Sequence, residues 1–315
     1  MSTILVTGAN GFVGSHLVPE LAAAGHRVVG LVRTTAAGEQ VVARLDQGAR
    51  SAVETRIGDV TDPATLPAAL EGVDAVAHLA AIPRDRGDGR DLLRVNTDGT
   101  RNVVEAMAAA GVRRLIHLGA LGVADDPALH YASSKARAEA LVASSALDWT
   151  ILKPSLLFGE RDGFFNIVAD LVRLSPGIVP VPGDGRSRFQ PLSGDDLAVA
   201  FRRTLEEPGY SGRSIELGGP RYWTYREITA EVCSAMARRR VILPMPVPVI
   251  RLVAGTSERI HLPFPVATDQ LRQLKLDNIG PLDGFVGAFG FAPRDMAGQL
   301  GYLRRRKAHQ EPEPA

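Results

Sequence analysis

Residues 3–17, TILVTGANGFVGSHL, place a short apolar run directly before three glycines at three-residue spacing. Gly8 permits a tight turn out of a strand, Gly11 lets backbone N–H groups approach a pyrophosphate, and Gly14 lets the next helix pack closely. An ordinary tight turn can carry the same spacing, but the position between an apolar strand and an amphipathic helix favours dinucleotide binding. The candidate cofactor contacts in this loop are Gly8, Asn10, Gly11, Phe12, Val13 and Gly14.

The composition predicts a globular protein with a packed core. The chain has 315 residues, is 45% hydrophobic and 23% charged, and carries a net charge of +1 without a long basic run. Nucleic acid is therefore a poor candidate partner. The single cysteine, Cys233, excludes an internal disulfide and a thiolate cluster, and we expect no metal site. Neither a secretion signal nor an apolar stretch of the roughly 18 residues that a membrane span needs is present, so we expect a cytoplasmic protein.

The first half of the chain alternates between short Val/Ile/Leu runs and alanine-rich helical patterns. The predicted strands are 3–8, 27–32, 52–59, 74–80, 113–119 and 148–154. The predicted helices between them are 14–25, 64–72, 99–111 and 133–145. Continuous apolar strands that alternate with helices are typical of a parallel sheet covered on both faces. We therefore predict an α/β fold, a doubly wound Rossmann sheet.

The pattern changes after about residue 158, where Gly and Pro become frequent and the strand–helix alternation stops. We predict that residues 1–158 form the NAD(P)-binding domain, with contributions from about 184–218. Residues 159–306 then form a smaller C-terminal α/β lobe for a substrate or partner, with helices near 194–207, 224–237 and 246–259. The apolar stretch LPMPVPVIRLVAG (243–255) is either a buried lobe helix or an apolar surface that contacts a substrate or a partner. The charged, Pro-rich end, 307–315, is expected to be disordered.

The residues after the second, third and fourth predicted strands are further candidate cofactor contacts. An acid at the end of the second strand would bind both adenosine ribose hydroxyls and repel a 2′-phosphate. This chain instead has Val32 followed by Arg33, and an arginine pairs bidentately with phosphate. NADP(H) is therefore favoured over NAD(H), although a solvated arginine would also fit a strand end. The other candidates at these strand ends are Asp59, Val60, Leu79, Ala80 and Ala81.

Tyr131 and Lys135 form a Tyr-x-x-x-Lys pair on the helix predicted after the fifth strand. Residues four apart share a helix face. A chain with five tyrosines and four lysines rarely has this spacing by chance, although a surface pair remains the alternative. A lysine ammonium beside a phenol lowers the pKa of the phenol, which can then exchange a proton with a carbonyl or alcohol oxygen. Tyr131 and Lys135 are the candidate catalytic residues. Both are also candidate cofactor contacts, because the same lysine can hold the ribose hydroxyls of a nicotinamide cofactor.

Several of these stretches together resemble the extended or atypical short-chain dehydrogenase/reductases, which are NAD-dependent epimerase/dehydratase-like. They are the glycine loop, GDVTD, HLAA, VNTDGTRNVVEAM, Tyr-x-x-x-Lys and DWTILKPSLLFG. Within that family, GDGRSRFQPLSGDDLAVA and SIELGGPRYWTYREI resemble the group related to the NADPH-binding accessory subunit of respiratory complex I. The resemblance implies catalytic roles for Tyr131 and Lys135. It also implies that Asn96, a candidate cofactor contact, lies in the helix beneath the site with either a structural or a proton-relay role. Leu118, Pro154, Ser155 and Leu156 would lie beside the cofactor.

One departure from the family pattern leaves two functions open. The family usually has Ser or Thr after the fifth strand, where this chain has Gly119 and Ala120; Ser133, Ser134 or a water could substitute. The first hypothesis is an NADP(H)-dependent oxidoreductase or epimerase/dehydratase-like enzyme acting on an unidentified small molecule, for which the apolar stretch 243–255 suggests a lipophilic character. The second is a non-catalytic NADPH-binding structural, assembly or sensor protein. A protein partner or a homodimer is compatible with either hypothesis.

The histidines offer no competing chemistry. His78 and His117 lie in apolar strand runs, so we expect satisfied core residues or walls of the site rather than catalytic bases.

Overall fold

The computed structural model describes residues 1–85, 88–246 and 277–304. Within these residues, seven strands form one parallel sheet with the order β11-β6-β5-β4-β1-β2-β3. The strands are β1 (Thr3–Thr7), β2 (Arg27–Val32), β3 (Val53–Ile57), β4 (Ala75–His78), β5 (Arg114–Leu118), β6 (Asp148–Pro154) and β11 (Arg213–Leu217). The chain runs outward from β1 to β3 and then returns to β4 on the other side of β1. The predicted doubly wound Rossmann sheet is confirmed.

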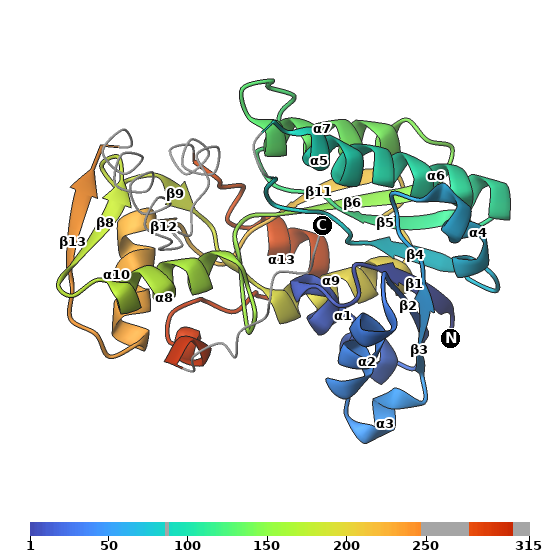
Figure 1. The fold of residues 1–315 in the computed structure, drawn as a ribbon, viewed down its shortest axis with the longest axis horizontal. Coiled ribbons are helices and arrows are strands. Elements are labelled where there is room, and N and C mark those ends of the chain that lie inside the picture. The colour runs from blue at the N-terminus through green and yellow to red at the C-terminus, as the bar shows by residue number, and fades with distance from the viewer. Residues whose placement is uncertain (86–87, 247–276, 305–315) are drawn as a thin grey trace.

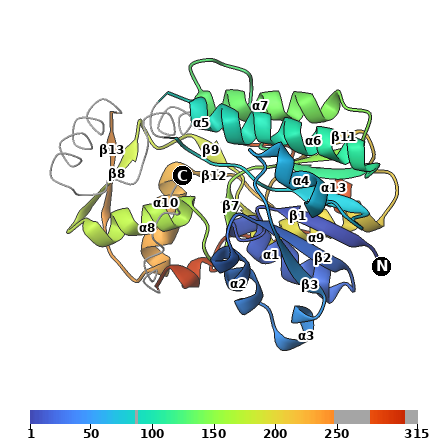
Figure 2. The same cartoon turned by 45° about the vertical axis from the view of Figure 1, so that its right-hand side comes forward.

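Helices cover both faces of the sheet (Figures 1 and 2). One layer contains α1 (Phe12–Ala23), α9 (Gly194–Glu206) and α13 (Gly284–Phe289), and the opposite layer contains α4 (Leu66–Ala69), α6 (Gly99–Ala110) and α7 (His130–Ala143). Ile4 and Val6 of β1 belong to one apolar core, and Leu5 belongs to the other. Because successive strand residues point to opposite faces, this alternation explains the continuous apolar runs of the sequence.

The connections within the Rossmann part contain short elements that the sequence did not predict. They are α2 (Thr35–Ala43), α3 (Gln47–Arg50), η1 (Pro63–Thr65), α5 (Arg90–Leu92) and η2 (Leu93–Asp98). Thr34 caps α2 by accepting a hydrogen bond from the Ala37 amide, and Gly38 faces Thr55, so a β-carbon there would lie only 2.7 Å from the Thr55 hydroxyl. A glycine within a short helix weakens the local helical signal. The segment η2 is a π-helix, a form that is rare and frequent at functional sites.

The lobe packs around its own apolar core beside the carboxyl edge of the sheet (Figure 1). It contains α8 (Phe164–Leu174), α10 (Tyr225–Ala235), β8 (Ile178–Pro182) paired with β13 (Val241–Met245), and β9 (Arg188–Phe189) paired with β12 (Trp223–Thr224). The remaining elements are β7 (Leu157–Phe158), β10 (Leu192–Ser193) and η3 (Leu300–Arg304). The stretch 179–196, although rich in Gly and Pro, contributes to three short strands, β8, β9 and β10.

The helices predicted near 194–207 and 224–237 correspond to α9 and α10. The helix predicted near 246–259, most of the stretch 243–255 and the tail 307–315 lie outside the described residues.

Candidate active site

A cleft of about 2490 Å³ lies at the carboxyl edge of the sheet, between the sheet and the lobe. It includes the point where the strand order reverses, between β1 and β4, which is where doubly wound sheets bind ligands. Of the predicted cofactor contacts, the cleft brings together Gly8, Asn10, Gly11, Phe12, Val13, Gly14, Arg33, Asp59, Val60, Leu79, Ala80, Ala81, Leu118, Tyr131, Pro154, Ser155 and Leu156. Asn96 and Lys135 are buried beside it and do not line it.

The glycine loop can fold this tightly at the edge of the cleft only because it has no side chains at its key positions. Gly8 has a φ of +70°, and a β-carbon there would lie 3.1 Å from the Ala80 backbone. A β-carbon at Gly14 would lie 2.5 Å from the carbonyl oxygens of Gly8 and Ala9. The N-terminus of α1 follows directly at Phe12 and adds the positive end of its dipole. The residues present therefore fit the pyrophosphate of a dinucleotide.

The far end of the cleft lies beside β2 and β3. Val32 is buried, whereas Arg33 is exposed and lines the cleft, so no acid occupies the end of β2. The Asp59 carboxylate accepts hydrogen bonds from the Thr61 amide and hydroxyl, at 2.8 and 2.9 Å, which fixes its orientation. An adenosine can fit at this end of the cleft. The residues at the end of β2, Val32 and Arg33, offer it an arginine and no carboxylate.

The Tyr–Lys pair lies at the opposite end of the cleft but differs from the expected arrangement. Tyr131 lines the cleft, while Lys135 is 3% exposed and its ammonium donates a hydrogen bond to the Leu118 carbonyl. Burial raises the pKa of Tyr131 to about 12, and burial lowers the pKa of Lys135 to about 8. The expected lowering of the phenol pKa by Lys135 is therefore wrong for this structure, because desolvation of Tyr131 dominates.

Glu139 is a third ionisable group on the same face of α7, and the sequence analysis missed it. Its carboxylate accepts a hydrogen bond from the Ala120 amide at 3.0 Å and lies 3.5 Å from the Lys153 ammonium. It further raises the pKa of Tyr131 and opposes the fall in the pKa of Lys135. Its spacing, four residues after Lys135, was the available signal.

Glu139 also explains why a hydroxyl side chain is absent at position 119. A β-carbon at Gly119 would lie 2.6 Å from the Glu139 carboxylate, whereas Ala120 is only partly buried and lines the cleft.

The two serines suggested as substitutes for the missing hydroxyl do not take that role. Ser133 and Ser134 are 4% and 0% exposed, and neither lines the cleft. The Ser133 hydroxyl donates to Asp125, and the Ser134 hydroxyl donates to the Tyr131 carbonyl.

Asn96 supports the cleft from beneath. Its side-chain oxygen accepts a hydrogen bond from the Ile82 amide at 2.8 Å. Its amide group donates to the Ile82 carbonyl and to the Ser134 hydroxyl, each at 3.0 Å. Asn96 thus orients the edge of the cleft and has no contact with its interior.

The two strand histidines differ from each other. His78 is hydrogen-bonded to the hydroxyls of Thr7 and Thr100, at 2.7 and 3.0 Å, as expected for a satisfied core residue. His117 is 1% exposed, and neither of its ring nitrogens has a hydrogen-bond partner among the described residues. His117 is thus a core residue, as expected, but its ring nitrogens are not satisfied by the described residues. Burial and the neighbouring Lys135 lower the pKa of both imidazoles, that of His78 to about 3.

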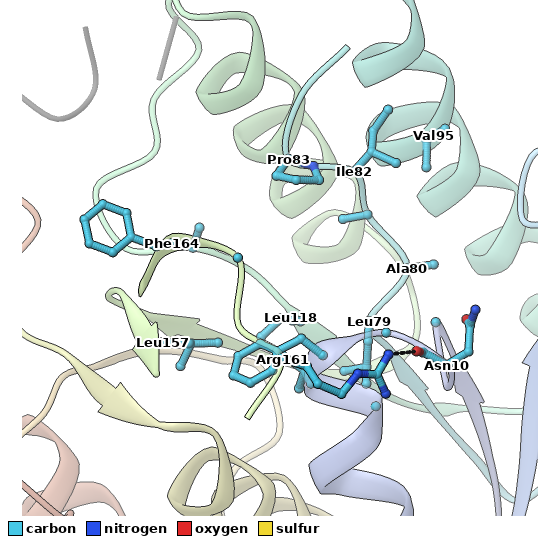
Figure 3. Close-up of a pocket in the computed structure, with 18 of the residues that line it drawn as sticks. Asn10, Leu79, Ala80, Ile82, Pro83, Val95, Leu118, Leu157, Arg161 and Phe164 are labelled. Carbon is cyan, nitrogen blue, oxygen red and sulfur yellow. Dashed lines mark hydrogen bonds between the residues drawn. The ribbon is translucent and has the colours of Figure 1, made fainter. Parts of the chain in front are cut away.

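Arg161 is a further cleft residue that the sequence analysis missed (Figure 3). It follows β7, has a left-handed backbone with a φ of 78°, and donates a hydrogen bond to the Asn10 carbonyl of the glycine loop at 3.2 Å. No local sequence pattern marks a side chain that reaches from the lobe to the first loop of the sheet.

The sheet, its reversal point and the glycine loop define a nucleotide-binding α/β protein. A family model described as NAD(P)H-binding matches residues 8–174, and the chain belongs to this family. A solved structure, dTDP-glucose 4,6-dehydratase DesIV from Streptomyces venezuelae, has a TM-score of 0.73 at 24% identity and covers 96% of each chain. The predicted resemblance to epimerase/dehydratase-like short-chain dehydrogenase/reductases is confirmed for the fold.

Two curated relatives show how varied the similar proteins are. The mitochondrial NADH dehydrogenase [ubiquinone] 1 alpha subcomplex subunit 9 of Arabidopsis thaliana is 28% identical over 289 residues, which are 88% of this chain and 68% of that protein. The chloroplastic divinyl chlorophyllide a 8-vinyl-reductase of Zea mays is 27% identical over 282 residues, covering 85% and 68%. The chain spans only 25% of a matching Mycobacterium tuberculosis protein.

Two searches of the described residues give negative results. None of their helices is both long and apolar enough to cross a membrane. Their His, Cys, Asp and Glu side chains form no group of three or more that could hold a metal ion.

Proposed function

We propose that the protein is an NADP(H)-dependent oxidoreductase that interconverts a carbonyl and an alcohol. The observation that carries this proposal is that Tyr131 and the glycine loop line one cleft. The glycine loop and Arg33 would hold the dinucleotide, which supplies the hydride when bound. Tyr131 would exchange a proton with the substrate oxygen, and the buried Lys135 and Glu139 would set the electrostatic field around it.

The protonation of the two groups favours reduction of a carbonyl. With a pKa of about 12, Tyr131 keeps its proton at neutral pH and is suited to donate it to a substrate oxygen. Lys135, with a pKa of about 8, remains largely charged at neutral pH, so that its positive charge would stay near the cleft during the reaction.

The cofactor preference rests on the end of β2. Arg33 can pair with an adenosine 2′-phosphate, and Val32 provides no carboxylate to bind both ribose hydroxyls. We propose that NADP(H) binds more tightly than NAD(H).

The lining of the cleft on the proposed substrate side favours an apolar small molecule as the substrate. Ile82, Pro83, Val95, Leu157 and Phe164 line it from both the sheet and the lobe (Figure 3). Such a wall fits a lipophilic carbonyl compound better than a sugar, which requires several hydrogen-bond partners.

The test is to identify the dinucleotide that co-purifies and to follow nicotinamide absorbance against a panel of carbonyl compounds. We expect turnover that Tyr131→Phe abolishes, and we expect Arg33→Ala to weaken NADP(H) binding relative to NAD(H). Tight NADPH binding with no turnover on any compound would contradict the enzyme proposal. An unchanged cofactor ratio in Arg33→Ala would contradict the proposed preference.

A second candidate is an NADPH-binding protein without turnover, which acts in assembly, in sensing or as the subunit of a larger complex or homodimer. Two observations favour it: the Lys135 ammonium is bound to the Leu118 carbonyl, and no hydroxyl side chain stands at Gly119 or Ala120. The similarity to a NADH dehydrogenase subunit also supports it. This candidate predicts that Tyr131→Phe leaves NADPH affinity and protein stability unchanged while no substrate is turned over.

A further inference from the structure

Two arginines from distant parts of the chain meet at one carbonyl of the glycine loop. Arg161, which follows β7, donates from Nη2 to the Asn10 oxygen at 3.2 Å (Figure 3). Arg44, the C-cap of α2, donates from Nη1 to the same oxygen at 3.1 Å and from Nη2 to Gln40 at 3.4 Å. The lobe and the Rossmann part therefore each place a guanidinium group at the same point of the cofactor loop.

Only one of the nitrogen atoms of the Arg161 guanidinium group takes part in this contact. The Nε and Nη1 atoms of Arg161 are buried and have no hydrogen-bond partner within the described part of the chain. Burial lowers the pKa of Arg161 to about 10, the neighbouring Arg44 acts in the same direction, and Glu160 opposes them. Buried donors without an acceptor destabilise a protein, so an anion that binds there would remove an existing cost.

The backbone at Arg161 is a second, independent sign of a functional role. Its φ of 78° is in the left-handed region, which is unfavourable for a residue other than Gly, Asn or Asp. Such a conformation persists where surrounding structure imposes it, and it is common at ligand sites. Here the residue with this conformation is Arg161, whose side chain extends from the lobe to the Asn10 carbonyl.

The free donors also lie where a phosphate would be expected. Arg161 and Asn10 line the same cleft as Arg33 and Gly11. A planar guanidinium group with two donors available matches two phosphate oxygens. Glu160, the residue before Arg161, is exposed, and its charge offsets part of that of Arg161.

We propose that Arg161 and Arg44 form a phosphate-binding site that joins the lobe to the glycine loop, and that its ligand is a phosphate group of the bound dinucleotide. This inference rests on the proposed dinucleotide binding. It adds that a lobe residue, and not only the Rossmann part, determines cofactor affinity. The phosphate is either the adenosine 2′-phosphate or the pyrophosphate, and the two sources give different results in the experiment below.

The experiment measures NADPH and NADH affinity by calorimetry for the full chain and for Arg161→Gln and Arg161→Lys. Arg186→Gln is the matched control, because Arg186 is exposed on the same lobe and does not line the cleft. Thermal unfolding with and without inorganic pyrophosphate gives a readout that needs no dinucleotide. Arg161→Asn is a second variant that tolerates the left-handed backbone and so controls for misfolding.

We expect Arg161→Gln to lose about 10- to 100-fold in affinity, the size of a lost charged hydrogen-bond pair, with Arg161→Lys in between. A loss for NADPH alone identifies the 2′-phosphate, and an equal loss for both dinucleotides identifies the pyrophosphate. We also expect pyrophosphate to raise the melting temperature of the wild type more than that of Arg161→Gln or Arg161→Asn.

Affinities in the Arg161 variants equal to those in Arg186→Gln would overturn the inference and leave Arg161 as a structural link between lobe and sheet. A wild-type chain that binds neither dinucleotide would instead overturn the proposed function. In that case a pyrophosphate effect lost in Arg161→Gln would still support the phosphate site.

Discussion

The two ends of the cleft are built by different means. At the glycine-loop end the backbone determines the shape, because Gly8 and Gly14 leave no space for a β-carbon. At the Tyr131 end the backbone is ordinary helix, and the properties of the site come from a buried lysine and a carboxylate, Lys135 and Glu139. Packing therefore determines the geometry of the first end, and charge determines the chemistry of the second.

This difference explains which parts a sequence reveals. A requirement for glycine can be recognised directly in the amino-acid sequence. The pKa of a tyrosine instead depends on how much water surrounds it in the folded protein. The two ends should therefore respond differently to substitution: the loop end to added volume, and the Tyr131 end to changes of charge and pH.

The largest effect is expected for Gly14→Ala. Its methyl group would lie 2.5 Å from two loop carbonyl oxygens, so the loop must shift. We expect dinucleotide affinity to fall by about 100-fold and stability by about 1–3 kcal/mol. Calorimetry and thermal unfolding measure both. Gly48→Ala is the matched control, because nothing lies within 4 Å of the added carbon; an equal loss in the two variants would show that the loop is not closely packed.

At the Tyr131 end, stability should depend on pH through Lys135. Its pKa in the folded protein is about 8, below the ordinary value of 10.5, so the unfolded chain binds more protons between these values. Stability should therefore rise with pH from about 8 to 10.5, by about 1–3 kcal/mol in wild type compared with Lys135→Met. Urea unfolding across this range tests it, and parallel curves for the two proteins would contradict it.

A smaller effect is expected for Glu139→Gln, which keeps the shape and removes the charge. Because Glu139 raises the pKa of both neighbours, the pKa values of Lys135 and Tyr131 should fall together, and stability should drop by about 1 kcal/mol as Lys153 loses its partner. With only four lysines in the chain, ¹⁵N-lysine NMR can follow Lys135 directly. Glu105→Gln, on the exposed side of α6, is the control and should leave both values unchanged.

The smallest effect is expected for Ala120→Ser, which places a hydroxyl at the Tyr131 end. Ala120 lines the cleft, so the new group can reach a substrate oxygen and should raise carbonyl reduction by about 5-fold, the value of one hydrogen bond. Gly119→Ser should instead lower activity, because its β-carbon would displace Glu139. Steady-state rates compare the two, and equal effects would mean that the position of the hydroxyl does not matter.

The sequence predicted the strands of the Rossmann sheet from 3–154 and the glycine loop well, because their apolar runs and glycines reflect local geometry. It also identified most cleft residues, since the ends of parallel strands meet at one edge. It failed for α2, because Gly38 weakens the helical signal and is required by the close packing against Thr55. It also failed for His117, because the absence of hydrogen-bond partners among the described residues depends on the tertiary structure. Arg161 was unpredictable because it approaches Asn10 across 151 positions of sequence.

The π-helix η2 makes the edge of the cleft depend on the number of residues in a helix as well as on their identity. Val95 lines the cleft, and the adjacent Asn96 holds Ile82. Each residue of a helix turns about 100°, so deleting one residue from Leu93–Asp98 would rotate the preceding part against α6. Val95 would then no longer line the cleft, or Asn96 would lose its hydrogen bonds to Ile82. The apolar contacts of α6 itself would be unchanged. A change in length at this segment is therefore a way to reshape the substrate wall without altering the core.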